Sequence, residues 1–244
     1  MDKDTIVGSL AAEWAAIEGL LAGLDEAQWA APTPCPGWTV HDWLQTHPSA
    51  LLDRLCAIPY GTFLFATIAF ALFLYARAPR EAVARFGWTF FAMSLMGFVT
   101  YHLYPAAPPW YFHAHGCAVD LTTHASEGPN LARVDAWLGV SFFGGLYGRS
   151  TDVFGSVPSL HVAYPLLILL EGWRWLRPAG RAGAVIFAIW MSFAAVYLDH
   201  HWIVDVVLGW LYCAGAYAVV FVLVGHAMRA PRQLVALGAE ARSP

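Results

Sequence analysis

The chain has 244 residues, of which 59% are apolar and only 12% are charged. Because an ordinary soluble domain has about 25% charged residues, this composition excludes a typical soluble protein and indicates a protein of the lipid bilayer. The formal net charge of -4 says little about partners, and we expect no nucleic-acid partner.

Residues 1–46 form a segment of their own in this interpretation. An apolar face near helical spacing, with both glutamates off that face, predicts a short amphipathic helix over residues 5–24 and no cleavable signal peptide. The next stretch, DEAQWAAPTPCPGWTVHDW, resembles the N-terminal bundle of mycothiol-dependent maleylpyruvate isomerases. In that family's register the metal ligand falls at Thr46, with His47 one place late, so we expect a structural segment here and no metal site.

Five apolar runs approach the length needed to cross about 30 Å of hydrocarbon. The third is the least regular, because Pro165, Glu171 and Arg174 interrupt it. We therefore predict an all-α fold, a polytopic membrane bundle of about five transmembrane helices over residues 47–228, followed by a cytoplasmic tail over residues 229–244. The runs are residues 58–76, 86–104, 158–176, 181–199 and 202–225.

Arginines mark the cytoplasmic side of this predicted bundle. By the positive-inside rule, the three loops or ends that carry them lie in the cytoplasm, so the segment 105–157 and the turn 199–201 face outward. The arginines are Arg77, Arg80 and Arg85, then Arg174, Arg177 and Arg181, and finally Arg229 and Arg232.

The second run ends in YHLYPAAPPWY, residues 101–111. Its prolines, Pro105, Pro108 and Pro109, lack a backbone N–H and disfavour helix in the residue before them, so we expect the helix to stop here. The neighbouring aromatic residues suit a membrane interface. Further along the outer segment, we expect a short amphipathic helix around Asn130–Leu138.

The stretch RSTDVFGSVPSLHVAYP opens the third run. Ser156 or Ser159 can cap a helix, and Pro158 suits its first turn. We therefore predict that a helix begins here with His161 in its first turn.

The stretch YLDHHWIVDVVLGW, residues 197–210, places ionisable groups at the mouth of the fifth run. His201 and Asp205 are four residues apart, so on a helix they share a face and the carboxylate can accept a hydrogen bond from the imidazole. A carboxylate at the centre of a membrane helix costs about 2.5–3.5 kcal/mol and is expected to have a partner. A purely structural pair is the alternative.

The predicted topology brings distant segments together. The third and fifth runs both lead inward from the outer face, so His161 and His201 both lie at outer helix starts, and the proline-rich segment reaches the same face. Two helix N-termini, two imidazoles and Arg149 would then surround a site that favours an anion, above all phosphate.

These segments resemble the type 2 phosphatidic acid phosphatase superfamily, and within it the inositol phosphorylceramide synthase branch, over residues 47–225. The sequence GSVPSLHVAYP matches the Pro-Ser-x-His motif, YLDHHWIVD matches the His-x-x-x-Asp motif, and YPAAPPWY matches the proline-rich element of that branch.

The resemblance implies a metal-free and cofactor-free reaction on a phosphohistidine. In it His201 is the nucleophile, Asp205 holds its other ring nitrogen, and His161 protonates the leaving alkoxide and then deprotonates the acceptor. The backbone N–H groups near Ser159 and Leu160 stabilise the phosphate oxygens. The expected substrate-binding residues are Ser159, Leu160, Arg149, Pro108, Trp110, Tyr111 and His200.

The chain also departs from that family. The superfamily has a Lys-x6-Arg-Pro motif and a Ser-Arg pair before the second histidine, whereas here the pair is Ala194 and Ala195 and the only lysine is Lys3. With fewer cations to bind phosphate than the superfamily motifs supply, the chain is expected to favour a phosphodiester donor, which carries one negative charge fewer than a phosphomonoester. Six spans are usual in the family, and here the N-terminal segment stands in place of the first.

The leading hypothesis is an integral membrane lipid phosphotransferase. It would move a phosphoinositol-type head group from a phospholipid donor to a lipid or water acceptor at the extracytoplasmic face of the plasma membrane. The alternatives are a lipid phosphate or polyprenyl pyrophosphate phosphatase and a non-enzymatic membrane scaffold with a decayed site. A vanadate haloperoxidase, which shares the histidines, is disfavoured by the five spans.

Overall fold

The structure is a computed structural model that describes residues 49–116, 118–120, 122–123, 129–147 and 153–240, with side chains up to residue 224. The predicted segment 1–46, with Thr46 and His47, lies outside the described residues, and so does Arg149.

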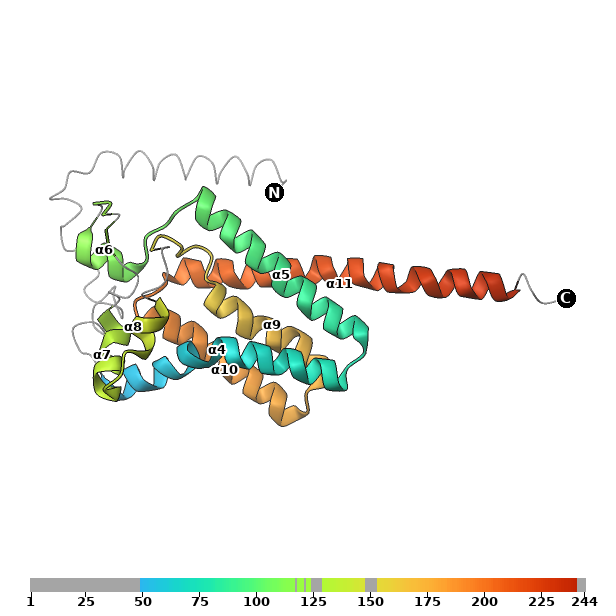
Figure 1. Cartoon of the computed structure of the whole chain (residues 1–244), viewed down its shortest axis with the longest axis horizontal. Helices are drawn as coiled ribbons and strands as arrows, with labels where there is room; N and C mark the ends of the chain where they lie inside the picture. The colour runs from blue at the N-terminus through green and yellow to red at the C-terminus, as the bar shows by residue number, and fades with distance from the viewer. Residues whose placement is uncertain (1–48, 117, 121, 124–128, 148–152, 241–244) are drawn as a thin grey trace, which may run out of the picture. The chain divides into compact units, whose positions relative to one another are not determined.

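The described part of the chain is built from helices and contains no β-strand, which confirms the predicted all-α class (Figure 1). One isolated β-bridge joins Ala106 and Gly155. The helices are α4 (Ala50–Arg77), α5 (Arg80–Leu103), α6 (Pro109–His115), α7 (Pro129–Leu138), α8 (Phe142–Tyr147), α9 (Leu160–Trp175), α10 (Pro178–Tyr197) and α11 (Ile203–Glu240).

Four helices of the described chain are long and apolar enough to cross a membrane: α4, α5, α10 and residues 203–224 of α11. The predicted third run forms α9, which has 16 residues and is therefore about 24 Å long. Helix α9 packs against α4, α5, α10 and α11. It is the central helix of the bundle, surrounded by protein, and the bundle of about five apolar helices in an integral membrane protein is confirmed.

A buried ion pair explains how this central helix accommodates Glu171, whose side chain is 0% exposed. Arg85 of α5 donates to both carboxylate oxygens, with Nε 2.7 Å from Oε2. Trp175 Nε1 and Tyr217 OH donate to the same carboxylate at 2.9 and 3.1 Å. The charge that interrupts the apolar run is thus neutralised by its neighbours inside the bundle.

Helix ends follow local signals in most places. Helix α4 begins at Ala50, earlier than the predicted residue 58, because Ser49 Oγ accepts a hydrogen bond from the Leu52 N–H. Helix α5 ends at Leu103, just before the prolines, as predicted. Helix α7 matches the predicted amphipathic helix closely, whereas α6 and α8 were not predicted. Helix α11 continues into the predicted tail, to Glu240.

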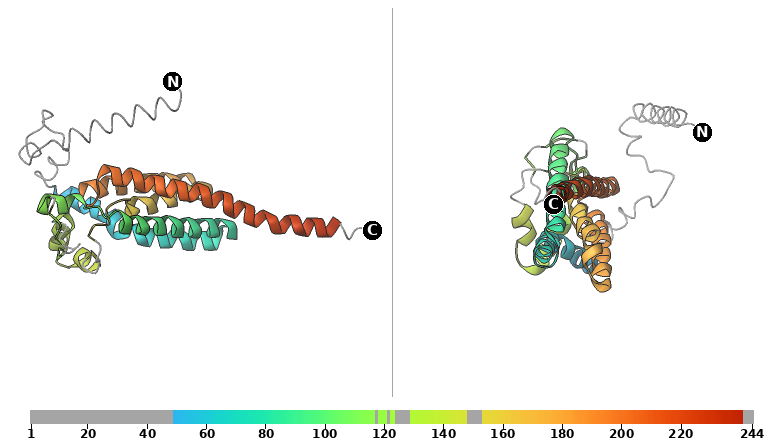
Figure 2. Two further views of the ribbon diagram at one scale, coloured as in Figure 1. Left: turned by 90° about the horizontal axis from the view of Figure 1, so that it is seen from above. Right: turned by 90° about the vertical axis from the view of Figure 1, so that its right-hand side faces the viewer.

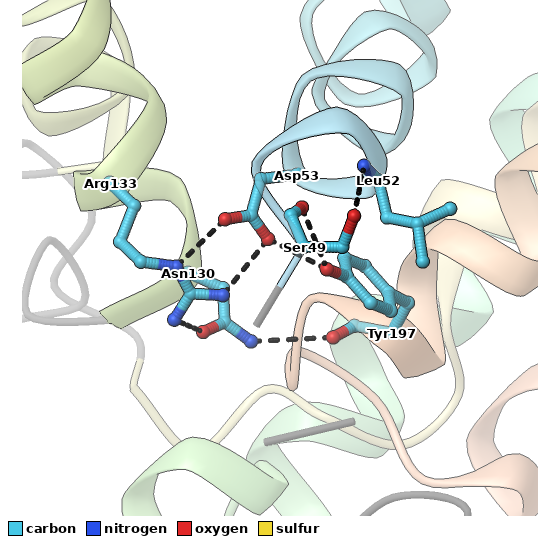
Figure 3. A network of polar contacts seen from close by, with 6 residues as sticks. All are labelled: Ser49, Leu52, Asp53, Asn130, Arg133 and Tyr197. Carbon is cyan, nitrogen blue, oxygen red and sulfur yellow. Dashed lines mark hydrogen bonds and ion pairs between the residues drawn. The ribbon is translucent and has the colours of Figure 1, made fainter. Parts of the chain in front are cut away.

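The short helices α6, α7 and α8 gather at the end of the bundle where α9 and α11 begin (Figures 1 and 2). Figure 3 shows the polar network that fastens α7 there. Arg133 donates twice to Asp53 of α4, both times at 2.9 Å. Tyr197 OH donates to the same carboxylate at 2.8 Å, and Asn130 Nδ2 donates to the Tyr197 carbonyl at 3.3 Å. Helix α7 is therefore tied to α4 and to the last residue of α10.

Candidate active site

The two histidines of the sequence motifs meet at the end of the bundle where the short helices α6, α7 and α8 gather. His161 lies in the first turn of α9 and His201 lies just before α11. Their rings face each other, with His161 Nδ1 3.0 Å from His201 Nε2. This contact confirms that the third and fifth helices begin at the same end of the bundle.

A close approach of two backbones brings the histidines together. The Ser159 N–H donates to the Asp205 carbonyl at 2.9 Å, so the start of α9 is bonded directly to the first turn of α11. One turn further along α11, a Cβ atom at Gly209 would collide with the Ser159 carbonyl oxygen. The absence of a side chain at this glycine is what allows the two helices to lie so near.

Asp205 is fully buried, at 0% exposure, but it acts differently from the prediction. His201 precedes the helix, so the two residues do not stack on one helical face. His201 Nδ1 lies 3.0 Å from the Ser156 carbonyl oxygen and 3.5 Å from Asp205 Oδ2. That carboxylate oxygen accepts from Ser156 Oγ at 2.5 Å and from the Trp202 N–H at 2.9 Å. Asp205 is therefore the third residue of α11, and its carboxylate accepts the N–H of the N-cap residue Trp202, which is one of the two hydrogen bonds of a capping box.

The proline-rich segment reaches the same site, as expected. The Ala106 N–H donates to the Phe154 carbonyl at 2.7 Å, and the Trp110 N–H donates to the Asp199 carbonyl at 3.0 Å. Trp202 Nε1 donates to the Ala107 carbonyl at 3.1 Å. The segment is thus hydrogen-bonded to both histidine-bearing stretches.

A cavity of about 300 Å³ opens onto both histidines. Of the predicted substrate-binding residues, Pro108, Trp110, Leu160 and His200 line it. The described side chains around it are mostly aromatic or apolar, and none of them is a lysine or an arginine. The lining is Phe63, Phe98, Tyr101, Pro108, Trp110, Tyr147, Val153, Gly155, Ser156, Leu160, His161, Tyr164, His200 and His201.

Three sequence expectations change at this site. Tyr111 turns away from the cavity, since its hydroxyl accepts from the Asp120 N–H at 2.6 Å. The Ser159 N–H already bonds Asp205, which removes it from the groups that could hold a phosphate. Pro158 lies before Ser159, the N-cap of α9, so the prediction that it belongs to the first turn is wrong.

His200 lines the cavity beside the motif histidines. Its ring stacks on Tyr147 with centroids 5.7 Å apart, and its Nε2 is buried without a hydrogen-bond partner among the described residues. Burial, with the nearby His201 ring, lowers the pKa of His200 from 6.5 to about 3. The side chain is therefore neutral at physiological pH.

Sequence reasoning missed two tyrosines at this site. Tyr147 OH lies 3.2 Å from His161 Nε2, and the Tyr60 ring stacks on the His161 ring with centroids 4.8 Å apart. Neither belongs to a motif, but both fall in helices that meet the histidine end of the bundle. The described residues contain no group of three or more side chains placed to hold a metal ion.

Comparisons with curated proteins give relatives of one kind. The phosphoinositol dihydroceramide synthase of Bacteroides thetaiotaomicron is 37% identical over 181 residues, which are 72% of this chain and 56% of that protein. The inositol phosphorylceramide synthase of Candida albicans is 35% identical over 68% of this chain and 35% of that protein. The inositol phosphorylceramide synthase catalytic subunit of Saccharomyces cerevisiae is 31% identical over 74% of this chain and 45% of that protein. The chain spans about half the length of these relatives or less.

No solved structure matches the chain. The family model of the mycothiol maleylpyruvate isomerase N-terminal domain matches residues 10–47, which confirms the resemblance of the N-terminal segment. The family model of the PAP2 superfamily matches residues 33–219 and takes in both histidine motifs and the proline-rich element. This match extends over most of the sequence, and the chain therefore belongs to the PAP2 superfamily.

Proposed function

We propose that the chain is a lipid phosphotransferase that moves a phosphoinositol head group from a phospholipid to the hydroxyl of a second lipid. The observation that carries the proposal is the contact of two imidazoles, His161 and His201, 3.0 Å apart in a cavity of the described residues. The names of the relatives supply the head group and suggest a ceramide-type acceptor.

In the first half of the reaction His201 Nε2 attacks the phosphorus of the donor. The P–O bond to the lipid alkoxide breaks as the N–P bond forms, and protonated His161 gives its Nδ1 proton to the leaving oxygen. An in-line displacement places that oxygen on the far side of phosphorus. Binding of the donor therefore replaces the imidazole–imidazole contact with two contacts to the phosphoryl group.

In the second half, neutral His161 takes a proton from the acceptor hydroxyl, whose oxygen attacks the phosphohistidine. The N–P bond breaks, His201 is regenerated, and the proton returns to His161. The Asp205 charge, 3.5 Å from His201 Nδ1, stabilises the positive imidazole of the intermediate. No metal or other cofactor enters this scheme.

The charge of the cavity favours a phosphodiester donor. A phosphomonoester dianion needs cationic partners, and none of the described residues that line this cavity is a lysine or an arginine. At the two positions where the superfamily has its Ser-Arg pair, Ala194 and Ala195 are 0% exposed. The Ala195 carbonyl accepts from the N–H groups of His200 and His201 at 3.2 and 3.0 Å, so this position shapes the histidine turn.

The distribution of arginines supports a location of this site at the extracytoplasmic face of the plasma membrane. Arg77 and Arg80 flank the junction of α4 and α5, whereas the cavity residues Phe98 and Tyr101 lie near the opposite end of α5. By the positive-inside rule, the arginine end is cytoplasmic. Phospholipid donor and lipid acceptor would then both come from the outer leaflet.

One assay tests the proposal and separates it from its alternatives. The purified full chain is incubated in detergent with inositol-labelled phosphatidylinositol, with and without a ceramide, alongside H161A, H201A and the matched control H102A, which alters an exposed histidine of α5. Labelled lipid product from the wild type and H102A, but from neither cavity variant, is the expected result. Release of soluble inositol phosphate in place of lipid product would establish hydrolysis, and no turnover by the wild type would support the scaffold.

A further inference from the structure

Tyr147, the last residue of α8, contacts the site from outside the two histidine motifs and the proline-rich element. Its hydroxyl lies 3.2 Å from His161 Nε2, and its ring lines the cavity. The two nitrogens of His161 therefore have different neighbours. Nδ1 faces His201 Nε2 at 3.0 Å, and Nε2 faces a tyrosine hydroxyl.

The backbone carbonyl of Ser156 fixes the direction of this hydrogen-bonded chain. A carbonyl oxygen only accepts, so His201 Nδ1, 3.0 Å away, carries a proton. A neutral imidazole has one N–H, which leaves a lone pair on His201 Nε2 for attack on phosphorus. His161 Nδ1 must then donate to that lone pair. The remaining contact, between His161 Nε2 and Tyr147, is the only one whose direction can change with the protonation of His161.

We propose that Tyr147 is a positioning residue that holds His161 Nε2 in both protonation states, so that the catalytic proton is exchanged at Nδ1. This inference rests on the proposed function. When His161 is protonated, the Tyr147 oxygen accepts from Nε2–H and Nδ1–H is free to protonate the leaving oxygen. After that transfer Nε2 keeps its proton and its partner, and the bare Nδ1 faces the acceptor hydroxyl.

The other neighbours of His161 cannot form this hydrogen bond to Nε2. Tyr60 of α4 stacks on the ring at 4.8 Å and Phe63 meets it edge-on at 5.0 Å, so both contact the ring surface. The remaining titratable side chains around it in the described part of the chain are His200 and His201 in the turn before α11, Asp205 behind His201, Tyr101 of α5 across the cavity, and Tyr164 one turn further along α9. Burial raises the pKa of Tyr147, which keeps its hydroxyl protonated.

The contact favours the protonated ring, because a hydrogen bond from a cationic N–H is stronger than one between neutral groups. Y147F removes it and keeps the stacking ring. We expect kcat for transfer to fall about tenfold and KM to stay within about twofold of the wild type. The variant lacks a charge-assisted hydrogen bond that acts in the chemical step and not in substrate binding. The basic limb of the pH–rate profile should move to lower pH. The control is Y212F. This variant removes a tyrosine hydroxyl that lies 2.8 Å from Thr100 Oγ1 and does not line the cavity.

A second measurement does not depend on turnover. In ¹⁵N-histidine NMR of the full chain in detergent, the His161 signal is assigned by its loss in H161Q, and its titration midpoint should be lower in Y147F than in the wild type and Y212F. An unchanged midpoint together with an unchanged pH–rate limb would overturn the role of Tyr147. If the wild type has no transfer activity but the His161 titration midpoint is lower in Y147F than in the wild type, the proposed function is refuted and the hydrogen-bond assignment stands.

Discussion

Asp205 reaches His201 through Ser156. The carboxylate accepts a hydrogen bond from Ser156 Oγ at 2.5 Å, and the carbonyl of the same serine lies 3.0 Å from His201 Nδ1. The direct distance from Asp205 Oδ2 to Nδ1 is 3.5 Å. The carboxylate thus contributes its charge directly, while the hydrogen bond that orients the imidazole comes from the serine that it holds.

This division of roles predicts unequal losses in two variants. D205N keeps an oxygen that can accept from Ser156 and Trp202 but removes the charge, so we expect transfer to fall by a factor of about 10² to 10⁴. S156A keeps the carbonyl and loses only the hydroxyl, for which we expect about a tenfold loss. Steady-state transfer rates of both proteins check the order. Equal rates for D205N and the wild type would show that the charge of the carboxylate is not used.

The approach of α9 and α11 gives a prediction with an internal control. A methyl group at Gly209 would collide with the Ser159 carbonyl oxygen, whereas a methyl group at Gly215 of the same helix meets nothing within 4 Å. We therefore expect G209A to separate the two histidines and to lose nearly all transfer activity. G215A should keep activity and thermal stability, since alanine favours a helix over glycine by about 1 kcal/mol. Similar activity in both variants would contradict the packing described here.

The parts of this architecture that the sequence predicts are those with a local signal. Apolar runs indicated the long helices, and the prolines after Leu103 indicated the end of α5. The two histidine motifs identified His161 and His201, and counting helices placed them at the same end. Helix α8 has six residues, which is too short for a periodic pattern, so Tyr147 could not be found this way.

Residue pairs that form only in the folded chain could not be predicted from the sequence either. Glu171 looked like an interruption of a membrane span, because its partner Arg85 lies 86 residues away. Asp205 looked like the hydrogen-bond partner of His201, because four-residue spacing suggests a shared helical face. The helix begins only at Ile203, which leaves His201 outside it. The N-cap residue Trp202 is not a residue type that caps helices with its side chain, so the sequence carries no complete capping signal for this start.

The Arg85–Glu171 pair should be important for stability. Both side chains are buried, at 4% and 0% exposure, so removal of one partner leaves an unpaired charge in the bundle. We expect R85M to lower the free energy of unfolding by about 3–5 kcal/mol. The double variant R85M/E171L should recover much of this loss, because it removes the second charge as well. Thermal unfolding in detergent compares the three proteins, and a double variant less stable than R85M would contradict this account.

His200 should make the fold sensitive to acid. Its pKa is lowered to about 3 in the folded chain, whereas an unfolded histidine has a pKa of about 6.5. Below that value the unfolded chain binds a proton that the folded chain does not bind until about pH 3. The contribution of His200 is therefore complete above about pH 6.5 and is lost progressively as the pH falls toward the folded value.

H200F tests this linkage, because phenylalanine retains the stacking on Tyr147 and removes the buried, unpartnered Nε2. Melting temperatures in detergent at about pH 7.5 and pH 4.5 should differ less for H200F than for the wild type. H102F, which changes an exposed histidine on α5, should follow the wild type. An equally steep decline in H200F would mean that other buried groups, and not His200, carry the acid sensitivity of the fold.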